Sequence, residues 1–448
     1  MKKKVDVVFL QKKRERKKNK RKLKKKNRRS RNREYLYSVQ KKIIQSLRIK
    51  NTSKLWSYCN NYFYDPNLIT YKLEVPSHFS LETNNFESIK FIKSLFTTLK
   101  HCSEYNNELV EISFEKCKTL RLGPLMVVNV IISDFFKWKS NIIKKGVPEH
   151  LLPNITLNPI MDDHINNLLF TMHFPVKIKK ADQVPVFGFR LIQGKVKASS
   201  FSDISKGKIS KGLRQYINSC LRVYEVELNE EGESLFDNMI GEILANADDH
   251  SSIDTWYANG SFSISNSNED DSEAMHLGEL NLIFLNFGES IYQGIEASSH
   301  LNSKMTSEMN ALYEQTINTQ TLRERFSKET MTTLYALQEG YSRLLYEDQS
   351  RGAGTMTFIR AFLDLGYDSL EQVSTLYILS GKSLIKCTPD LKPFLIENRY
   401  YLSLNSQKDM THPPSETNAL TLDEYFPGTL LVTSIFLNKE HLKSMANE

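Results

Sequence analysis

A carboxylate and a carboxamide lie four residues apart in one stretch of the sequence, at Glu242 and Asn246. The apolar residues around them recur at helical spacing, so we expect a helix that presents both side chains on one face. A carboxylate can orient and deprotonate water, and an amide oxygen is a hard ligand for Mg²⁺. A site that hydrolyses a magnesium nucleotide needs both groups, and Glu242 as the catalytic base and Asn246 as the metal ligand could supply them.

Two glycine-containing segments follow this helix. A predicted strand ends at Asn286-Phe287-Gly288, and a later turn, Arg351-Gly352-Ala353-Gly354-Thr355, leads directly into a predicted helix. A glycine turn at the start of a helix can bind phosphates through backbone N–H groups and the helix dipole. A P-loop of the GxxxxGK[ST] type does not occur in the sequence.

In this order, the three segments resemble the nucleotide-binding boxes of the gyrase, chaperone, histidine-kinase and mismatch-repair (GHKL) ATPases. The resemblance implies that ATP and Mg²⁺ are the cofactors and that Asn286 takes the place of an aspartate that binds the adenine amino group. Ser290 replaces the second glycine of that box. An asparagine lacks the charge that strengthens such a bond, which leaves adenine selectivity open. The predicted cofactor-binding residues are Asn246, Asn286, Gly288, Arg351, Gly352, Gly354 and Thr355.

The elements that would position these residues are also predictable. The polar, helical stretch of about 289–350 would be a mobile ATP lid. Three later strand-like segments, STLYILSGK, SLIKC and PGTLLVTSIFL, would complete the sheet, with Gly381 and Gly428 at turns. We expect an α/β fold of the α+β sandwich kind, in which a GHKL ATPase-type mixed sheet carries helices on one face.

Upstream, residues 70–180 alternate between strand-like and helix-like patterns, which predicts a compact α/β unit. The order of these elements resembles STAS-like domains, where a serine in a strand-to-helix turn can accept phosphate. Leu122 takes the place of that serine, and the nearby hydroxyl of Thr119 is expected to cap a helix. The unit is therefore interpreted as a docking or dimerising module.

The N-terminal 33 residues carry nineteen Lys and Arg against two acids, Asp6 and Glu15, whereas the rest of the chain has a net charge of −9. Such a segment predicts a disordered or helical arm. It would either be a solvated tail, with or without docking on the acidic body, or bind the phosphates of RNA or DNA. An anionic lipid surface and an acidic partner are further alternatives.

The five cysteines are far apart and form no metal-binding pattern, so we expect reduced, mostly buried thiols. No apolar run is long enough to span a bilayer, which predicts a cytoplasmic protein without a membrane span. The predicted organisation is a basic arm, a helical connector, a STAS-like domain, a linker and a GHKL ATPase-like domain, at residues 1–33, 34–69, 70–180, 181–206 and 207–448.

These features predict an ATP-binding and ATP-hydrolysing conformational switch that controls a protein or nucleoprotein partner. The resemblance is to bacterial proteins, and a phage-defence or mobile-element system is one hypothetical setting. Two alternatives stay open: a protein kinase of the anti-sigma or histidine-kinase type, and a scaffold that does not hydrolyse nucleotide. A homodimer is compatible with each of them.

Overall fold

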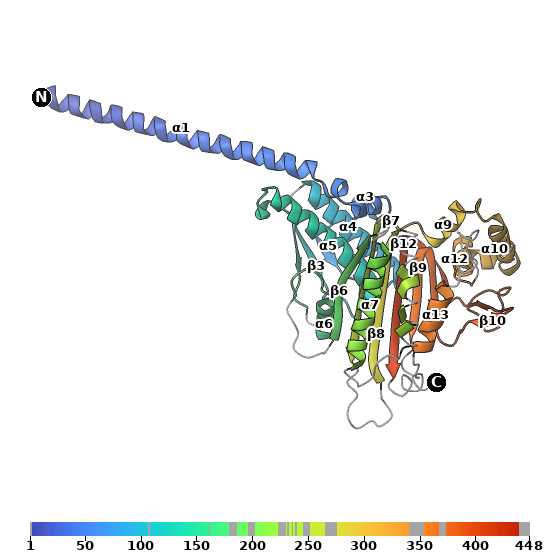
Figure 1. Ribbon diagram of the computed structural model, residues 1–448. Helices are drawn as coiled ribbons and strands as arrows, with labels where there is room; N and C mark the ends of the chain where they lie inside the picture. The colour runs from blue at the N-terminus through green and yellow to red at the C-terminus, as the bar shows by residue number, and fades with distance from the viewer. Residues whose placement is uncertain are drawn as a thin grey trace.

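A computed structural model gives the protein a mixed α/β fold (Figure 1). The residues it describes are 2–105, 108–160, 162–178, 186–195, 202–222, 230, 233–234, 236–237, 240–244, 251–264, 276–339, 354–366 and 373–438.

The chain begins with one long helix, α1 (Lys2–Ser46), that projects away from the body (Figure 1). The predicted arm and the start of the predicted connector are therefore one continuous helix. Only its C-terminal end is anchored, where Ile44 is buried and the Trp138 indole donates a hydrogen bond to the Leu47 carbonyl. Two further helices follow, α2 (Ile49–Thr52) and α3 (Lys54–Phe63).

The next unit has the alternation of strands and helices that the sequence predicts. Its three-stranded sheet is parallel in the order β1-β3-β5, and a second parallel pair joins β2 and β4. The strands are β1 (Lys72–Glu74), β2 (His78–Phe79), β3 (Leu109–Ser113), β4 (Thr119–Leu120) and β5 (Asn154–Leu157). The helices are α4 (Asn85–Tyr105), α5 (Leu122–Lys144) and α6 (Asp163–Thr171), with short 3₁₀ turns η1 (Pro66–Leu68) and η2 (Glu149–Leu151).

The largest element is a five-stranded sheet in the order β6-β7-β8-β12-β9. Its strands are β6 (Val186–Lys195), β7 (Ser251–Ile264), β8 (His276–Gly288), β9 (Thr375–Cys387) and β12 (Ala419–Asn438). Every neighbouring pair is antiparallel, so the prediction that this sheet is mixed was wrong. The parallel pairs lie in the preceding unit, and the predicted linker contributes the edge strand β6.

Both faces of this sheet are covered by helices. Along β8, Leu285 and Phe287 belong to a core shared with α3, α4 and α5. Leu282 and Phe284 point to the opposite face, where they pack with α7 (Ser202–Leu221), the helical segment 240–244 and α13 (Gly354–Leu365). The prediction of helices on one face was therefore incomplete, because the N-terminal unit supplies a second layer. We call the face covered by α7, 240–244 and α13 the distal face.

The first part of the predicted lid is folded as four helices, α9 (Ile291–Ala297), α10 (Ser303–Thr316), α11 (Gln320–Arg325) and α12 (Lys328–Ala336). Met331 and Leu334 of α12 are buried in the distal core, and α12 packs along β9. Residues 291–337 thus form a packed helical unit beside the sheet rather than an open loop. Residues 340–350 lie outside the described part of the chain, and lid mobility stays a prediction. A hairpin, β10 (Phe394–Ile396) and β11 (Arg399–Tyr401), completes this side.

All five cysteines are buried and free, which confirms the expectation of unpaired thiols. Among the helices in the described ranges, none combines the length and the apolar composition that a bilayer span requires.

The first turn of α5 lies against the five-stranded sheet. The hydroxyl of Tyr377 on β9 is buried beside Gly123, and a Cβ atom built on Gly123 would lie 2.0 Å from that hydroxyl oxygen. Leu122 is buried at the same joint, while Thr119 lies in β4 with its hydroxyl 3.2 Å from His78 Nδ1. Because α5 begins after Arg121, Thr119 caps no helix, and that expectation was wrong.

We predict that Gly123→Ala lowers the free energy of unfolding by about 1–3 kcal/mol, because the new methyl group overpacks the joint with Tyr377. Urea titration of the variant would measure this loss. Adding Tyr377→Phe should restore part of it by removing the hydroxyl. Gly212→Ala in α7 is the control, since no atom lies within 4 Å of its added Cβ. This exposed helical position should gain roughly 0.5–1 kcal/mol. Equal effects at the two glycines would contradict the packing argument.

Candidate functional site

Asn286 occupies the C-terminal end of β8, and its side chain faces the distal face. This orientation follows from the alternation along the strand, because Phe284 points to the distal core and Leu285 and Phe287 point to the other core. The helical segment that carries Glu242 covers the same face, with Ile243 buried in the distal core. The sheet thus brings Asn286 and the Glu242 helix to one side.

Asn286 belongs to a row of polar side chains that crosses three strands. It pairs with Thr429 on β12, which in turn pairs with Ser380 on β9. Directly paired residues on neighbouring strands point to the same face of a sheet, so all three side chains face the distal side. The Ser380 hydroxyl oxygen lies 2.9 Å from that of Thr429 and accepts a hydrogen bond of 2.9 Å from the Ile291 N–H. We call Asn286, Thr429 and Ser380 the polar row.

One donor in the polar row is left without a partner. The Asn286 side chain is buried, and its Nδ2 atom makes no hydrogen bond within the described part of the chain. A buried polar group in this condition costs about 1–3 kcal/mol. A ligand that offered a hydrogen-bond acceptor to Asn286 would remove this cost.

Glycines on the neighbouring strands allow the backbone to close around Asn286. Gly428 on β12 has φ +126°, and a Cβ atom there would lie 2.1 Å from the Asn286 carbonyl oxygen. Gly381 on β9 has φ +61°, and a Cβ atom there would collide with Glu329 and Ser290. Both glycines lie inside strands, so the expectation that they mark turns between strands was wrong. Their positive φ angles are conformations that residues with a side chain rarely adopt.

The segment after β8 is fixed by a helix cap. The Ser290 hydroxyl accepts a hydrogen bond from the Gln293 N–H, and the Gln293 side chain accepts one from the Ser290 N–H. This capping box begins α9. Ser290 therefore has a structural role as the cap of α9. The carbonyl of Gly288 accepts a hydrogen bond from the Tyr58 hydroxyl.

The glycine turn ends in a helix, as predicted, because α13 begins at Gly354. Gly366, just past the other end of α13, lies against Ser374, which directly precedes β9. The twelve residues of α13 rise about 18 Å. The strand from Thr375 to Ser380 covers about 17 Å. Since α13 packs along β9 and β12, we infer that its N-terminal end lies near the level of the polar row.

The predicted site residues are therefore only partly described. Glu242 is exposed on its helical segment, and Gly354 and Thr355 begin α13. Asn246, Arg351 and Gly352 lie outside the described residues, as does His250. Thr429 and Ser380 were not predicted as site residues. Their signal in the sequence was a hydroxyl residue directly beside a glycine, with Thr429 after Gly428 and Ser380 before Gly381.

Lys382, a secondary candidate for phosphate binding, is exposed next to Gly381. Its backbone N–H donates a hydrogen bond of 2.9 Å to the Glu329 carboxylate. Burial raises the pKa of Glu329, and the Lys382 N–H and charge oppose that rise. A carboxylate this close to Lys382 makes the lysine a weaker candidate for an anion.

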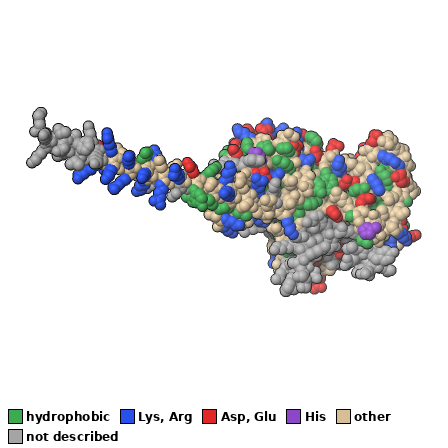
Figure 2. Space-filling view, turned by 90° about the horizontal axis from the view of Figure 1, so that it is seen from above, with side chains coloured by type: hydrophobic (Ala, Val, Ile, Leu, Met, Phe, Trp, Pro, Cys, Tyr) green, Lys and Arg blue, Asp and Glu red, His purple; other side chains and the backbone are tan. Residues whose placement is uncertain are grey.

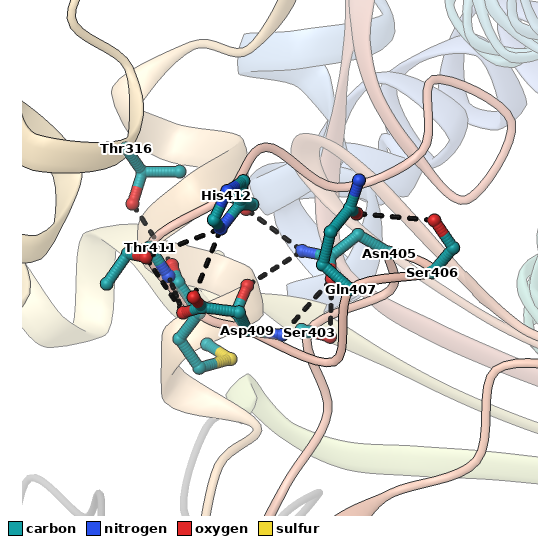
Figure 3. A network of polar contacts seen from close by, with 9 residues as sticks. Thr316, Ser403, Asn405, Ser406, Gln407, Asp409, Thr411 and His412 are labelled. Carbon is teal, nitrogen blue, oxygen red and sulfur yellow. Dashed lines mark hydrogen bonds and ion pairs between the residues drawn. The ribbon is translucent and has the colours of Figure 1, made fainter.

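A second polar cluster, at residues 403–412, stabilises a loop (Figure 3). Asn405 donates to the carbonyls of Asp409 and His412, and Thr411 donates twice to the Asp409 carboxylate, which lowers its pKa. His412 Nδ1 lies 3.1 Å from Asp409. Among the described residues, no serine or cysteine contacts His412, so the cluster lacks the nucleophile of a Ser-His-Asp site.

A surface cavity of about 600 Å³ lies in the N-terminal unit, far from the polar row in the sequence. Its buried Lys139 is held by Glu149 and Asn154, each at 3.2 Å. The lysine is therefore already paired. Elsewhere too, within the residues that the structure describes, no three His, Cys, Asp or Glu side chains gather as a metal site would require.

Comparison of the chain with protein-family models, with curated proteins and with solved structures gave no match. The interpretation of the site therefore depends on its geometry and chemistry.

Proposed function

We propose that the distal face of the five-stranded sheet binds a magnesium–purine nucleotide, with ATP as the expected ligand, and that the protein is a hydrolysing switch that acts on a partner. The observation that supports this most directly is the buried side chain of Asn286, whose Nδ2 atom has no hydrogen-bond partner among the described residues and which lies beside the hydroxyls of Thr429 and Ser380. A purine edge presents both donors and acceptors, which an amide and a hydroxyl can match.

The other predicted residues would bind different parts of the nucleotide. The N–H groups at the start of α13, at Gly354 and Thr355, would hold phosphate oxygens. Asn246 would be the magnesium ligand, and Arg351 and Gly352 would complete the phosphate turn. Glu242 would orient and deprotonate the attacking water. The bound magnesium triphosphate would supply a phosphoanhydride bond. Cleavage of this bond would drive the switch back to its starting state.

Contacts from the N-terminal unit offer a route by which the site could influence the rest of the molecule. Tyr58 of α3 donates to the Gly288 carbonyl, two residues after Asn286. Tyr62 of α3 stacks on Tyr425 with ring centroids 5.3 Å apart, and the Tyr425 hydroxyl donates to Gln293 of the capping box. A shift of the segment 286–293 would therefore change the contacts of α3, and α3 follows closely after α1 in the sequence.

The first test concerns Asn286. Asn286→Leu should weaken nucleotide binding by about 10- to 100-fold, because the variant loses the hydrogen bonds of a buried amide. Calorimetric titration with Mg-ATP and Mg-GTP would measure the loss and show which base is preferred. Asn281→Leu, a buried asparagine on the same strand outside the polar row, is the matched control. If both variants bind as the parent protein does, Asn286 does not face the base.

The second test concerns hydrolysis. Glu242→Ala should slow the release of inorganic phosphate by about 10²- to 10⁴-fold, the usual contribution of a general base, and leave nucleotide affinity unchanged. Glu230→Ala, which removes another exposed helical carboxylate, is the control and should hydrolyse normally. Undiminished phosphate release from the Glu242 variant would remove this residue from the mechanism. Transfer of labelled phosphate to a protein would favour the kinase alternative.

A further inference from the structure

The longest helix of the protein carries a surface that the nucleotide site does not use. From Arg14 to Arg31, twelve described Lys and Arg side chains accompany one acid, Glu15, and one apolar residue, Leu23. All of them are exposed, and Figure 2 shows blue side chains along the projecting rod. The twelve residues are Arg14, Arg16, Lys17, Lys18, Lys20, Arg21, Lys22, Lys24, Lys25, Lys26, Arg28 and Arg31.

The basic residues follow a four-residue pattern. Every fourth position is not basic, and the three between are. The non-basic positions are Gln11, Glu15, Asn19, Leu23 and Asn27. Three consecutive residues of an α-helix span about 200° around its axis, and a step of four residues moves on by about 40° beyond a full turn. The positive charge of 16–18, 20–22 and 24–26 therefore covers more than half of the circumference, and the non-basic stripe winds slowly around the helix.

This distribution fits a partner that surrounds the helix. A flat bilayer meets one side of a helix, and helices that bind it have an apolar face opposite the charged one. Leu23 is the only apolar residue between 14 and 31, so this segment of α1 has no such face. A groove between two rows of phosphates meets both sides of the helix at once.

The dimensions match the major groove of B-form DNA. That groove is about 12 Å wide and admits an α-helix, whereas the major groove of A-form RNA is deep and narrow. Residues 14–31 rise about 27 Å, which is somewhat less than one turn of the duplex. Their net charge of +12 gives one positive charge per about 2.3 Å, against one phosphate per about 1.7 Å of duplex.

The arm is also held away from the protein's own acidic body. Its helix is continuous from Lys2 to Ser46, and the side chains described between 14 and 38 are exposed, whereas Ile44 and Leu47 pack on the body. In both Figure 1 and Figure 2 it extends outward as one rod, so residues 14–31 could reach the body only if the helix broke.

We propose that α1 is a binding element for double-stranded DNA that recognises the phosphate backbone, without regard to base sequence. This assignment is independent of nucleotide binding by the body. The DNA-binding segment is residues 14–31, and the polar row contributes nothing to it.

The test uses the full-length protein without nucleotide and a fluorescein-labelled duplex DNA of about 20 base pairs, long enough for two helical turns. Fluorescence anisotropy is measured over a range of KCl concentrations. A triple variant that combines Lys24→Gln, Lys25→Gln and Lys26→Gln should weaken binding about tenfold or more at low salt. It should also reduce the slope of log K against log salt by about 2 to 3. Glutamine keeps the helix, because its helix propensity is close to that of lysine.

Two matched variants separate charge at this surface from other effects. A second triple variant, Lys118→Gln with Lys304→Gln and Lys392→Gln, removes the same charge from exposed positions of the body. It should leave DNA affinity unchanged. Arginines at 24, 25 and 26 should keep it as well. Equal losses in the arm and body variants would overturn the proposal. So would equal or tighter binding to a duplex RNA of the same length, or to phosphatidylserine vesicles.

Discussion

The burial of both faces of one antiparallel sheet is the constraint on which the rest of the structure depends. Strand β8 places Leu282 and Phe284 in one core and Leu285 and Phe287 in the other, so neither face can be left to solvent. The helices α3, α4 and α5 cover one face, and α7 and α13 cover the other. The hydrophobic effect thus joins the N-terminal parallel unit to the sheet as part of one core.

Burying polar side chains on a face of this kind costs free energy. Asn286, Thr429 and Ser380 nevertheless lie side by side on three strands. The hydroxyls of Thr429 and Ser380 contact each other, and the Asn286 Nδ2 atom has no partner in the part of the chain that the structure describes. A sheet built only for packing would carry apolar residues at these positions. The two positive-φ glycines beside them let the backbone approach closely, which is also unnecessary for packing alone. Together these features make this end of the distal face the best supported location for a ligand.

The contact between the two units changes the interpretation of the segment that contains Leu122 and Gly123. Leu122 and Gly123 face Tyr377 of the sheet, and ion pairs join Lys93 to Glu424 and Lys386 to Glu82 across the same contact. The unit does dock through this surface, but on the same chain. Its remaining surfaces, and the projecting α1, are therefore the ones open to other molecules.

The sequence by itself determined the local elements: the alternation of strands and helices from 70 to 180, the strand ending at Asn286, and the helix beginning after the glycine turn. These elements could be predicted because apolar spacing and glycine placement determine backbone conformation through residues that are close in the sequence. The sequence left open what depends on distant contacts: the antiparallel order of the sheet, the second helical layer, and the pairing of Asn286 with Thr429, 143 positions later in the chain. It likewise allowed residues 1–33 to be disordered or helical. The structure describes residues 2–33 as part of the single helix α1, whose far end is fixed by packing around Ile44 and Leu47.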